Sequence, residues 1–200
     1  MIRLIPTDSR LSSAQPTRRA VVFLDRDGVL VEDVHYLRRV AQVRLLPGVA
    51  QALRMLAAHF WLIVATNQSG LARGYLTEAE LAAIHQALLA QLQAEGATLD
   101  AIYACPHLPD GTVPAYRMAC TCRKPAPGML LRACQDWAIS AEDSYMVGDT
   151  PRDIEAGNAA GLQAILIGAN TCPLPTSRPS LWAEDLLRAA YLICHREGLA

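Results

Sequence analysis

"AVVFLDRDGVL", residues 20–30, is the stretch that decides the expected fold. It begins with a short apolar run, Ala20–Leu24, which includes β-branched residues and ends abruptly at Asp25-Arg26-Asp27-Gly28. An apolar run of this length, followed by charged residues and a glycine, is typical of a buried strand that leads into a loop. We therefore expect two carboxylates at the carboxyl end of this strand.

Similar apolar runs recur along the chain and alternate with helical patterns. We expect four further strands, at 61–65, 101–104, 144–147 and 164–167. We expect helices at 49–59, 77–94, 127–137, 151–160 and 183–195, and Thr77 and Glu80 suit a capping box. This alternation predicts an α/β fold with a doubly wound, Rossmann-like and mostly parallel sheet that carries helices on both faces.

The composition predicts one globular domain. The 200 residues are 52% apolar and 18% charged, which is enough for a sizeable core. The formal net charge of -1 indicates no surface for nucleic acid or an anionic membrane, so we expect a small-molecule partner. We also expect a monomer. Residues 1–19 lack the apolar run of a signal peptide, and no segment resembles a membrane span. We expect a cytoplasmic protein with a flexible arm over 1–19 and one domain over 20–200.

Polar residues follow the expected strands. In chain order they are Asp25, Asp27, Thr66, Lys124, Asp149 and Asp153. Because open parallel sheets bind ligands at the carboxyl ends of their strands, these side chains should converge on one face. Taken singly, an Asp-x-Asp pair is an ordinary turn or helix cap, and a lysine is a solvated surface charge. Their shared placement favours phosphoryl transfer, where charge must be neutralised and the reacting groups held in line.

Two carboxylates beside a phosphate repel it, so the same pattern predicts a divalent cation. Mg²⁺ prefers hard oxygen ligands, which Asp25, a backbone carbonyl near Asp27 and Asp149 could supply. One carboxylate can then act as the nucleophile while its neighbour transfers protons. Gly28 would let the backbone turn closely beneath the ligand.

A second set of ligands lies between the third and fourth expected strands. Cys105 and His107 are followed, after twelve intervening residues, by Cys120 and Cys122. One imidazole and three thiolates form a closed tetrahedral set suited to structural Zn²⁺, which would hold the Arg123 and Lys124 that follow it. The alternative is a group of unliganded thiols beside a surface histidine. The other cysteines have no partners at useful spacing and are interpreted as packing residues: Cys134, Cys172 and Cys194.

Four segments together resemble a known superfamily. They are FLDRDGVL, ATNQSGLARGYLT, CRKPAPGML and MVGDTPRDIEAG. They resemble the motifs of the haloacid dehalogenase (HAD) superfamily of Mg²⁺-dependent phosphohydrolases. Over residues 20–170 the pattern is most similar to the D-glycero-D-manno-heptose 1,7-bisphosphate 7-phosphatases, which act in making the heptose of bacterial lipopolysaccharide or surface glycans and have the same zinc loop. The segments 28–65 and 67–123 leave no room for a separate cap domain.

The resemblance implies roles for the residues at the strand ends. Asp25 would be the nucleophile that forms an aspartyl-phosphate, and Asp27 would protonate the departing sugar oxygen and later deprotonate the attacking water. Thr66 and Lys124 would hold the phosphoryl oxygens. Mg²⁺ would be bound by Asp25, the Asp27 carbonyl and Asp149, with Asp153 supporting them from one helical turn further on.

The resemblance also implies substrate contacts. They would come from two loops and from the residue after the zinc ligands: Asp33, Val34, His35, Tyr36, Asn67, Gln68, Ser69 and Arg123. Arg123 would meet the second phosphate or the rim of the sugar. The chain departs from some members at Thr150, where they have a lysine that reaches the substrate.

The expected function is removal of the 7-phosphate of the heptose bisphosphate, for ADP- or GDP-heptose precursor synthesis, and alternatives stay open. Histidinol-phosphate phosphatases resemble the same motifs and zinc loop, although the long segment 108–119 favours the heptose enzymes. A non-catalytic, zinc-stabilised binding module would have lost an essential acid, and none is lost. A phosphatase of nucleic-acid ends is disfavoured because the chain shows no basic stripe and only 6% aromatic residues.

Overall fold

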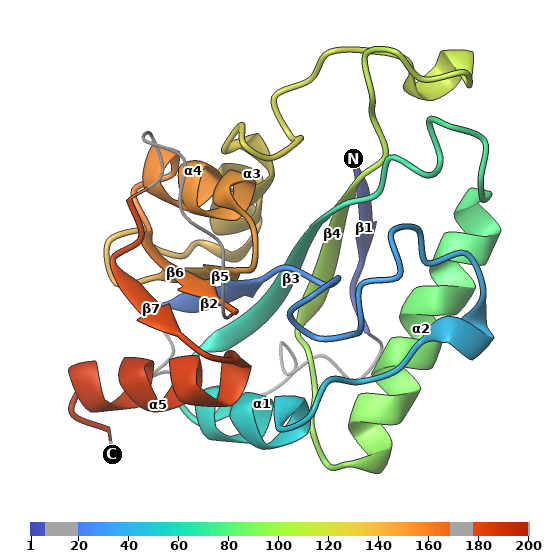
Figure 1. Cartoon of the computed structure of the whole chain (residues 1–200). Helices are drawn as coiled ribbons and strands as arrows, with labels where there is room; N and C mark the ends of the chain where they lie inside the picture. The colour runs from blue at the N-terminus through green and yellow to red at the C-terminus, as the bar shows by residue number, and fades with distance from the viewer. Residues whose placement is uncertain (7–19, 169–177, 200) are drawn as a thin grey trace.

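The computed structural model describes residues 1–6, 20–168 and 178–199 and contains one seven-stranded sheet (Figure 1). The order across the sheet is β1-β4-β3-β2-β5-β6-β7. The strands are β1 (Ile2–Leu4), β2 (Val21–Leu24), β3 (Trp61–Asn67), β4 (Ala101–Cys105), β5 (Tyr145–Gly148), β6 (Gln163–Ile167) and β7 (Leu181–Ala183). Only β1, which pairs with β4, runs antiparallel to its neighbour among the described strands. The expected doubly wound, mostly parallel sheet is therefore confirmed.

The strand order determines where in the sheet the expected site lies. From β2 the chain proceeds to β3 and β4 on one side, and it then crosses back to β5 and β6 on the other side of β2. A crevice opens at such a reversal, at the carboxyl ends of the strands. The segments that follow β2, β3 and β5 therefore meet at one place.

Helices cover both faces of the sheet. One face carries α1 (Val49–Ala57), α2 (Glu78–Ala94) and α5 (Leu186–Arg196), and the other carries α3 (Gly128–Trp137) and α4 (Pro151–Ala159) (Figure 1). Successive residues of β2 alternate between the two cores: Val22 and Leu24 pack with the first layer, and Val21 and Phe23 pack with the second. This follows from the two-residue period of a strand, and it explains why the run is apolar throughout.

The connections after β2 and β3 run over residues 25–60 and 68–100. They hold η2 (Val40–Gln42), α1 and α2, with no separate cap domain, as expected. The predicted capping box at α2 is confirmed, because the Thr77 side chain accepts from the Glu80 amide while Glu80 accepts from the Thr77 amide. Cys134 and Cys194 are buried in the cores, as expected, and Cys172 lies outside the described residues.

Two edge strands differ from the expectation. The arm expected over 1–19 begins as strand β1, whose Ile2 and Leu4 pack against the core, and residues 7–19 lie outside the described part. At the other end, 181–183 is a strand where a helix was expected to begin at 183. The helix α5 begins later because Asp185 caps it by accepting from the Arg188 amide at 2.7 Å.

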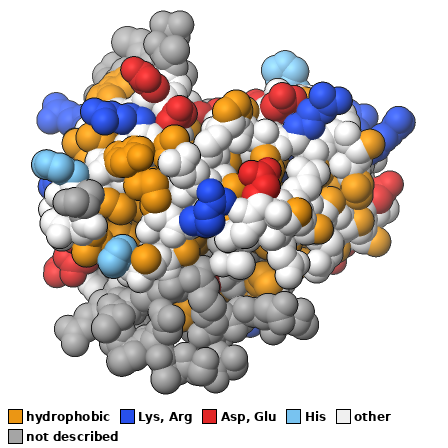
Figure 2. Space-filling model, turned by 90° about the horizontal axis from the view of Figure 1, so that it is seen from below, with side chains coloured by type: hydrophobic (Ala, Val, Ile, Leu, Met, Phe, Trp, Pro, Cys, Tyr) orange, Lys and Arg blue, Asp and Glu red, His pale blue; other side chains and the backbone are white. Residues whose placement is uncertain are grey.

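The surface carries charges of both signs. On the face seen from below in Figure 1, basic and acidic side chains are interspersed with hydrophobic ones (Figure 2). This mixture agrees with the net charge of -1. Within the described ranges, no helix has the combination of length and apolar character that crossing a membrane requires.

Candidate active site and metal centre

A cleft of about 380 Å³ lies at the carboxyl ends of the central strands. All but one of the residues predicted for catalysis, magnesium binding or substrate contact line it: Asp25, Asp27, Asp33, His35, Tyr36, Thr66, Asn67, Gln68, Ser69, Arg123, Lys124, Asp149 and Asp153. The exception is Val34, which is exposed and borders a neighbouring groove instead. The structure thus gathers side chains that are far apart in the sequence.

Three carboxylates converge in this cleft. Oxygens of Asp25, Asp149 and Asp153 all lie within 4.8 Å of one another. Gly28 makes this approach possible, because its φ is +75° and a Cβ there would lie 2.1 Å from Asp149 Oδ2. Only a residue without a side chain fits that conformation and that space.

Lys124 is buried among these carboxylates. Its ammonium donates to the Ala65 carbonyl at 2.6 Å and forms ion pairs with Asp25 Oδ2 at 3.1 Å and Asp153 Oδ1 at 2.6 Å. Burial alone would lower the pKa of Lys124, but the charges of Asp153 and Asp25 outweigh it and raise that pKa. The lysine is therefore a fixed positive charge beside Asp25.

Two of these carboxyl groups, Asp25 and Asp149, hold protons more tightly than usual. Burial raises the pKa of Asp25 to about 7, with further contributions from Asp153 and Asp27, although Lys124 opposes the shift. Burial and the charge of Asp153 raise the pKa of Asp149 to about 6. Both shifts indicate an excess of negative charge in a poorly solvated place.

A charge count shows what would relieve this excess. At the centre of the cleft, four carboxylates meet two buried cations: Asp25, Asp27, Asp149, Asp153, Arg26 and Lys124. Apart from Asp33 and the less buried Arg73, Arg123 and Arg152, which also line the cleft, this centre has an excess of two negative charges, which is the charge that one divalent cation supplies. Hard carboxylate oxygens are also the ligands that Mg²⁺ prefers, so the residues present fit the predicted ion.

Asp153 has a structural role as well. Its Oδ2 accepts from the Thr150 amide at 3.1 Å and the Thr150 hydroxyl at 2.6 Å, which closes the first turn of α4. Thr150 thus acts as a helix cap at the edge of the cleft.

Sequence reasoning missed a buried network around Asp27. The Arg26 side chain is 1% exposed and donates to both Asp27 oxygens, with Nε to Oδ1 at 3.1 Å and Nη2 to Oδ2 at 2.8 Å. It also donates to Gln68 Oε1 at 3.0 Å and lies 3.3 Å from His85 Nε2. No sequence signal distinguishes an arginine inside an Asp-x-Asp motif from a solvated one.

Two residues predicted to touch substrate are occupied by protein contacts. Gln68 donates to Asp27 Oδ2 at 3.1 Å and to Thr66 Oγ1 at 2.9 Å. Asn67 donates to the Lys124 carbonyl at 2.9 Å and accepts from its amide at 3.0 Å. Both amides serve to position the predicted catalytic groups, since their donors and acceptors face these groups.

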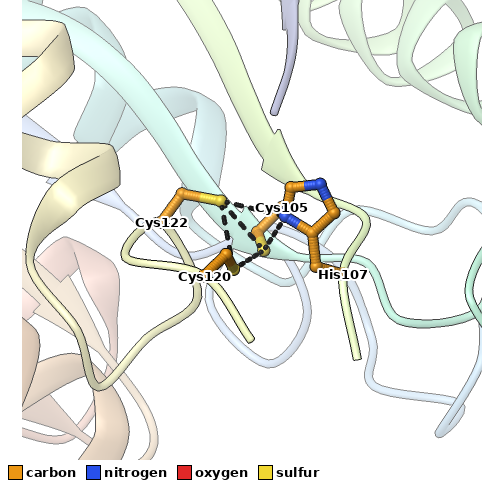
Figure 3. Close-up of side chains that lie close together, drawn as sticks. All are labelled: Cys105, His107, Cys120 and Cys122. Carbon is orange, nitrogen blue, oxygen red and sulfur yellow. Dashed lines mark hydrogen bonds between the residues drawn. The ribbon is translucent and has the colours of Figure 1, made fainter. Parts of the chain in front are cut away.

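The predicted zinc ligands also come together (Figure 3). The sulfurs of Cys105, Cys120 and Cys122 are 3.3–3.6 Å apart, and His107 Nδ1 lies 3.4 Å from Cys122 Sγ and 3.8 Å from Cys105 Sγ. The edges of a tetrahedron with Zn–S bonds near 2.3 Å measure about 3.8 Å. These separations fit a single zinc ion and are too long for a disulfide.

The loop that carries the predicted zinc ligands, residues 105–122, is tied to the rest of the cleft. The Val113 amide donates to the Ala72 carbonyl at 2.9 Å, and Tyr116 donates to Glu78 Oε1 at 2.6 Å. The Arg123 side chain donates to the His107 carbonyl at 3.4 Å. The loop thus connects the start of α2 with the segment that carries Lys124.

Aromatic and basic side chains lie in the cleft and beside it. Tyr36 and Tyr75 pack edge to face at 4.9 Å, and the Arg38 guanidinium lies 4.0 Å from the centre of the Tyr75 ring. Arg73 and Arg152 line the cleft and were not predicted. Together with Arg123 they form a basic rim around the acidic centre.

The fold and site define the class of HAD-like hydrolases. The family model described as HAD-hydrolase-like matches residues 121–189. This range includes Lys124, Asp149 and Asp153. Together with the similarity to the proteins described next, this match shows that the chain is a phosphatase of the HAD superfamily.

Three similar proteins are named as heptose bisphosphate phosphatases. The protein is 43% identical over 188 residues to "D-glycero-D-manno-heptose-1,7-bisphosphate 7-phosphatase" of Thermosynechococcus vestitus, covering 88% of this chain and 96% of that one. It is 42% identical over 151 residues to "D-glycero-beta-D-manno-heptose-1,7-bisphosphate 7-phosphatase" of Rhodopseudomonas palustris, covering 75% and 84%. The D,D-heptose 1,7-bisphosphate phosphatase of B. bronchiseptica, solved with magnesium and phosphate, superposes with a TM-score of 0.75 at 33% identity, covering 89% and 99%. The chain belongs to the D-glycero-D-manno-heptose-1,7-bisphosphate 7-phosphatase family, and the expected resemblance is confirmed.

Proposed function

We propose that this phosphatase removes the 7-phosphate of D-glycero-D-manno-heptose 1,7-bisphosphate through an aspartyl-phosphate on Asp25. The observation that carries the proposal is the placement of Asp25 beside the buried Lys124 ammonium and close to the Asp149 and Asp153 carboxylates. The names of the relatives support the substrate. The product would supply ADP- or GDP-heptose synthesis, with the enzyme acting as a cytoplasmic monomer.

Mg²⁺ would be held by Asp25, the Asp27 carbonyl and Asp149. When bound, it would neutralise charge on the phosphoryl oxygens and the nucleophile. The magnesium and phosphate in the B. bronchiseptica relative support this assignment. Zn²⁺ on the four ligands described above would have a structural role, since the set leaves no open position.

The protein groups would act in two steps. An Asp25 oxygen forms a bond to phosphorus while the bond from phosphorus to the sugar oxygen breaks, and Asp27, which would enter this step in its protonated form, gives its proton to that oxygen. In the second step Asp27 takes a proton from water, the water oxygen bonds to phosphorus, and the Asp25 carboxylate leaves. The Thr66 hydroxyl, which accepts from Gln68, can donate its hydrogen to a phosphoryl oxygen, and Lys124 balances its charge.

The basic rim supports a substrate with a second phosphate. Arg73, Arg123 and Arg152 line the cleft outside the acidic centre, where a guanidinium can pair with a phosphate through two donors. Asp33, His35, Tyr36 and Ser69 lie in the same cleft and could hydrogen-bond to sugar hydroxyls. This rim favours a bisphosphate over a substrate with one phosphate.

The test is phosphate release from both anomers of D-glycero-D-manno-heptose 1,7-bisphosphate and from histidinol phosphate, with Mg²⁺ and with a chelator. Phosphorus NMR of the product identifies which phosphate is lost. We expect one heptose anomer to be preferred, the 7-phosphate to be removed and the chelator to abolish turnover. Preference for histidinol phosphate, or loss of the 1-phosphate, would refute the substrate assignment.

A further inference from the structure

His85 lies behind the predicted acid–base residue without touching it. It is on α2, only 2% exposed, and its Nε2 lies 3.3 Å from Arg26 Nη1. The opposite side of the Arg26 guanidinium is bonded to the Asp27 carboxylate through Nε and Nη2. A line of three side chains thus runs from a helix in the core to the cleft.

The contact with Arg26 determines the protonation state and the tautomer of His85. A guanidinium has only donors, so His85 Nε2 must accept, and the ring must be neutral with its hydrogen on Nδ1. Burial and then the charge of Arg26 lower the pKa of His85 to about 3, which agrees with this form. The ring is therefore a fixed acceptor for Arg26.

A buried arginine without an acceptor for Nη1 would be unsatisfied on that side and would turn to find one. Turning the planar guanidinium moves Nε and Nη2, which hold both Asp27 oxygens. Gln68, which donates to Asp27 and accepts from Arg26, fixes the same plane from the β3 side. The orientation of the Asp27 carboxyl thus depends on groups outside the cleft.

We propose that His85 is a positioning residue that orients Arg26 and, through it, the Asp27 carboxyl for proton transfer to the leaving sugar oxygen. This inference rests on the proposed function, in which Asp27 is the acid. It predicts that the loss of His85 slows the step that needs a proton more than a step that needs none. p-Nitrophenolate can leave without being protonated, whereas a sugar oxygen must be protonated as it leaves.

The experiment compares kcat/KM of His85→Leu and His85→Gln on the heptose bisphosphate and on p-nitrophenyl phosphate. This ratio reports the steps up to departure of the leaving group. For His85→Leu we expect a loss of about 10-fold on the sugar phosphate and less than about 2-fold on the aryl phosphate, since general acid catalysis contributes about 100-fold or more when fully intact. His85→Gln, whose amide oxygen can accept from Arg26, should restore most of the sugar phosphate rate.

Controls separate this role from a structural one. Asp27→Asn should show the same dependence on the leaving group in stronger form, and His195→Leu, at an exposed position on α5, should change neither rate. Equal losses on both substrates, or a glutamine variant as slow as the leucine variant, would overturn the positioning role. If His85→Leu does not fold, His85→Met replaces it in the same comparison. An unaltered protein that cannot hydrolyse the heptose bisphosphate refutes the proposed function itself.

Discussion

Replacing Gly28 with alanine tests whether the acidic centre depends on a missing side chain. The new Cβ would lie 2.1 Å from Asp149 Oδ2 and 2.7 Å from Asp149 Cγ. A normal contact of this kind is longer than about 3 Å, so either the loop or the Asp149 carboxylate must move by about 1 Å. Because Asp25 and Asp149 are proposed to share one cation, this movement would separate its ligands.

Two effects contribute to the expected result. Alanine at φ +75° costs about 1–2 kcal/mol of stability, whatever its surroundings. A misplacement of about 1 Å at a catalytic centre costs about 100-fold in turnover. We therefore expect a small fall in the midpoint of thermal unfolding and a large fall in kcat, together with a higher Mg²⁺ concentration for half-maximal activity.

Gly96→Ala is the matched control. Its φ is +70°, and its nearest neighbour would be Arg54 Cδ at 3.9 Å, so it carries the backbone cost without the clash. Thermal unfolding and steady-state kinetics over a Mg²⁺ titration measure both effects in both variants. A Gly28→Ala protein with unchanged kcat and Mg²⁺ dependence would refute the reasoning, as would a Gly96→Ala protein that loses equal activity.

Three further predictions address other parts of the molecule. Asp25→Asn should abolish phosphate release while circular dichroism shows an intact fold, because the nucleophile is lost with little change in volume; retained turnover would contradict the proposed intermediate. Cys120→Ser should lower both the zinc content, measured by metal analysis, and the unfolding temperature, and a zinc content still at one per chain would show the ligand assignment to be wrong. His85→Gln should alter the acid dependence of stability: the folded pKa of His85 lies near 3, below the ordinary 6.5, so the unfolded chain binds one more proton as pH falls through this window. The unaltered protein should lose up to about 1.4 kcal/mol per pH unit relative to the variant, and parallel stability curves in denaturant titrations would refute this.

The sequence predicted the parts of the fold that depend on local pattern. The strand at 21–24 is marked by its apolar run, and the helix at 78–94 is marked by its regularly spaced apolar residues and by Thr77. The strands at 2–4 and 181–183 carry no such mark, because three residues become a strand only by pairing with a neighbour. Their existence is a property of the assembled sheet.

The same distinction applies to the site. Asp25 and Asp149 were predicted because each follows a strand of a parallel sheet, and the topology then brings them together. The role of Arg26 was not predicted, because its partner His85 is 59 residues away and the burial of both is set by tertiary packing. Asn67 was assigned to the substrate by its position in a motif, whereas the structure shows both ends of its amide bonded to the Lys124 backbone.

The pairing of β1 with β4 has a consequence for handling the protein. β1 covers the outer side of β4, and Arg3 pairs with Asp136 of α3 at 2.9 Å to hold it there. Without residues 1–6, the backbone groups of β4 would form an open edge on which a strand of another molecule could add. That strand ends at Cys105, so the first residues of the chain protect the strand of a predicted zinc ligand from intermolecular pairing and aggregation. An affinity tag is therefore better placed at the C-terminus.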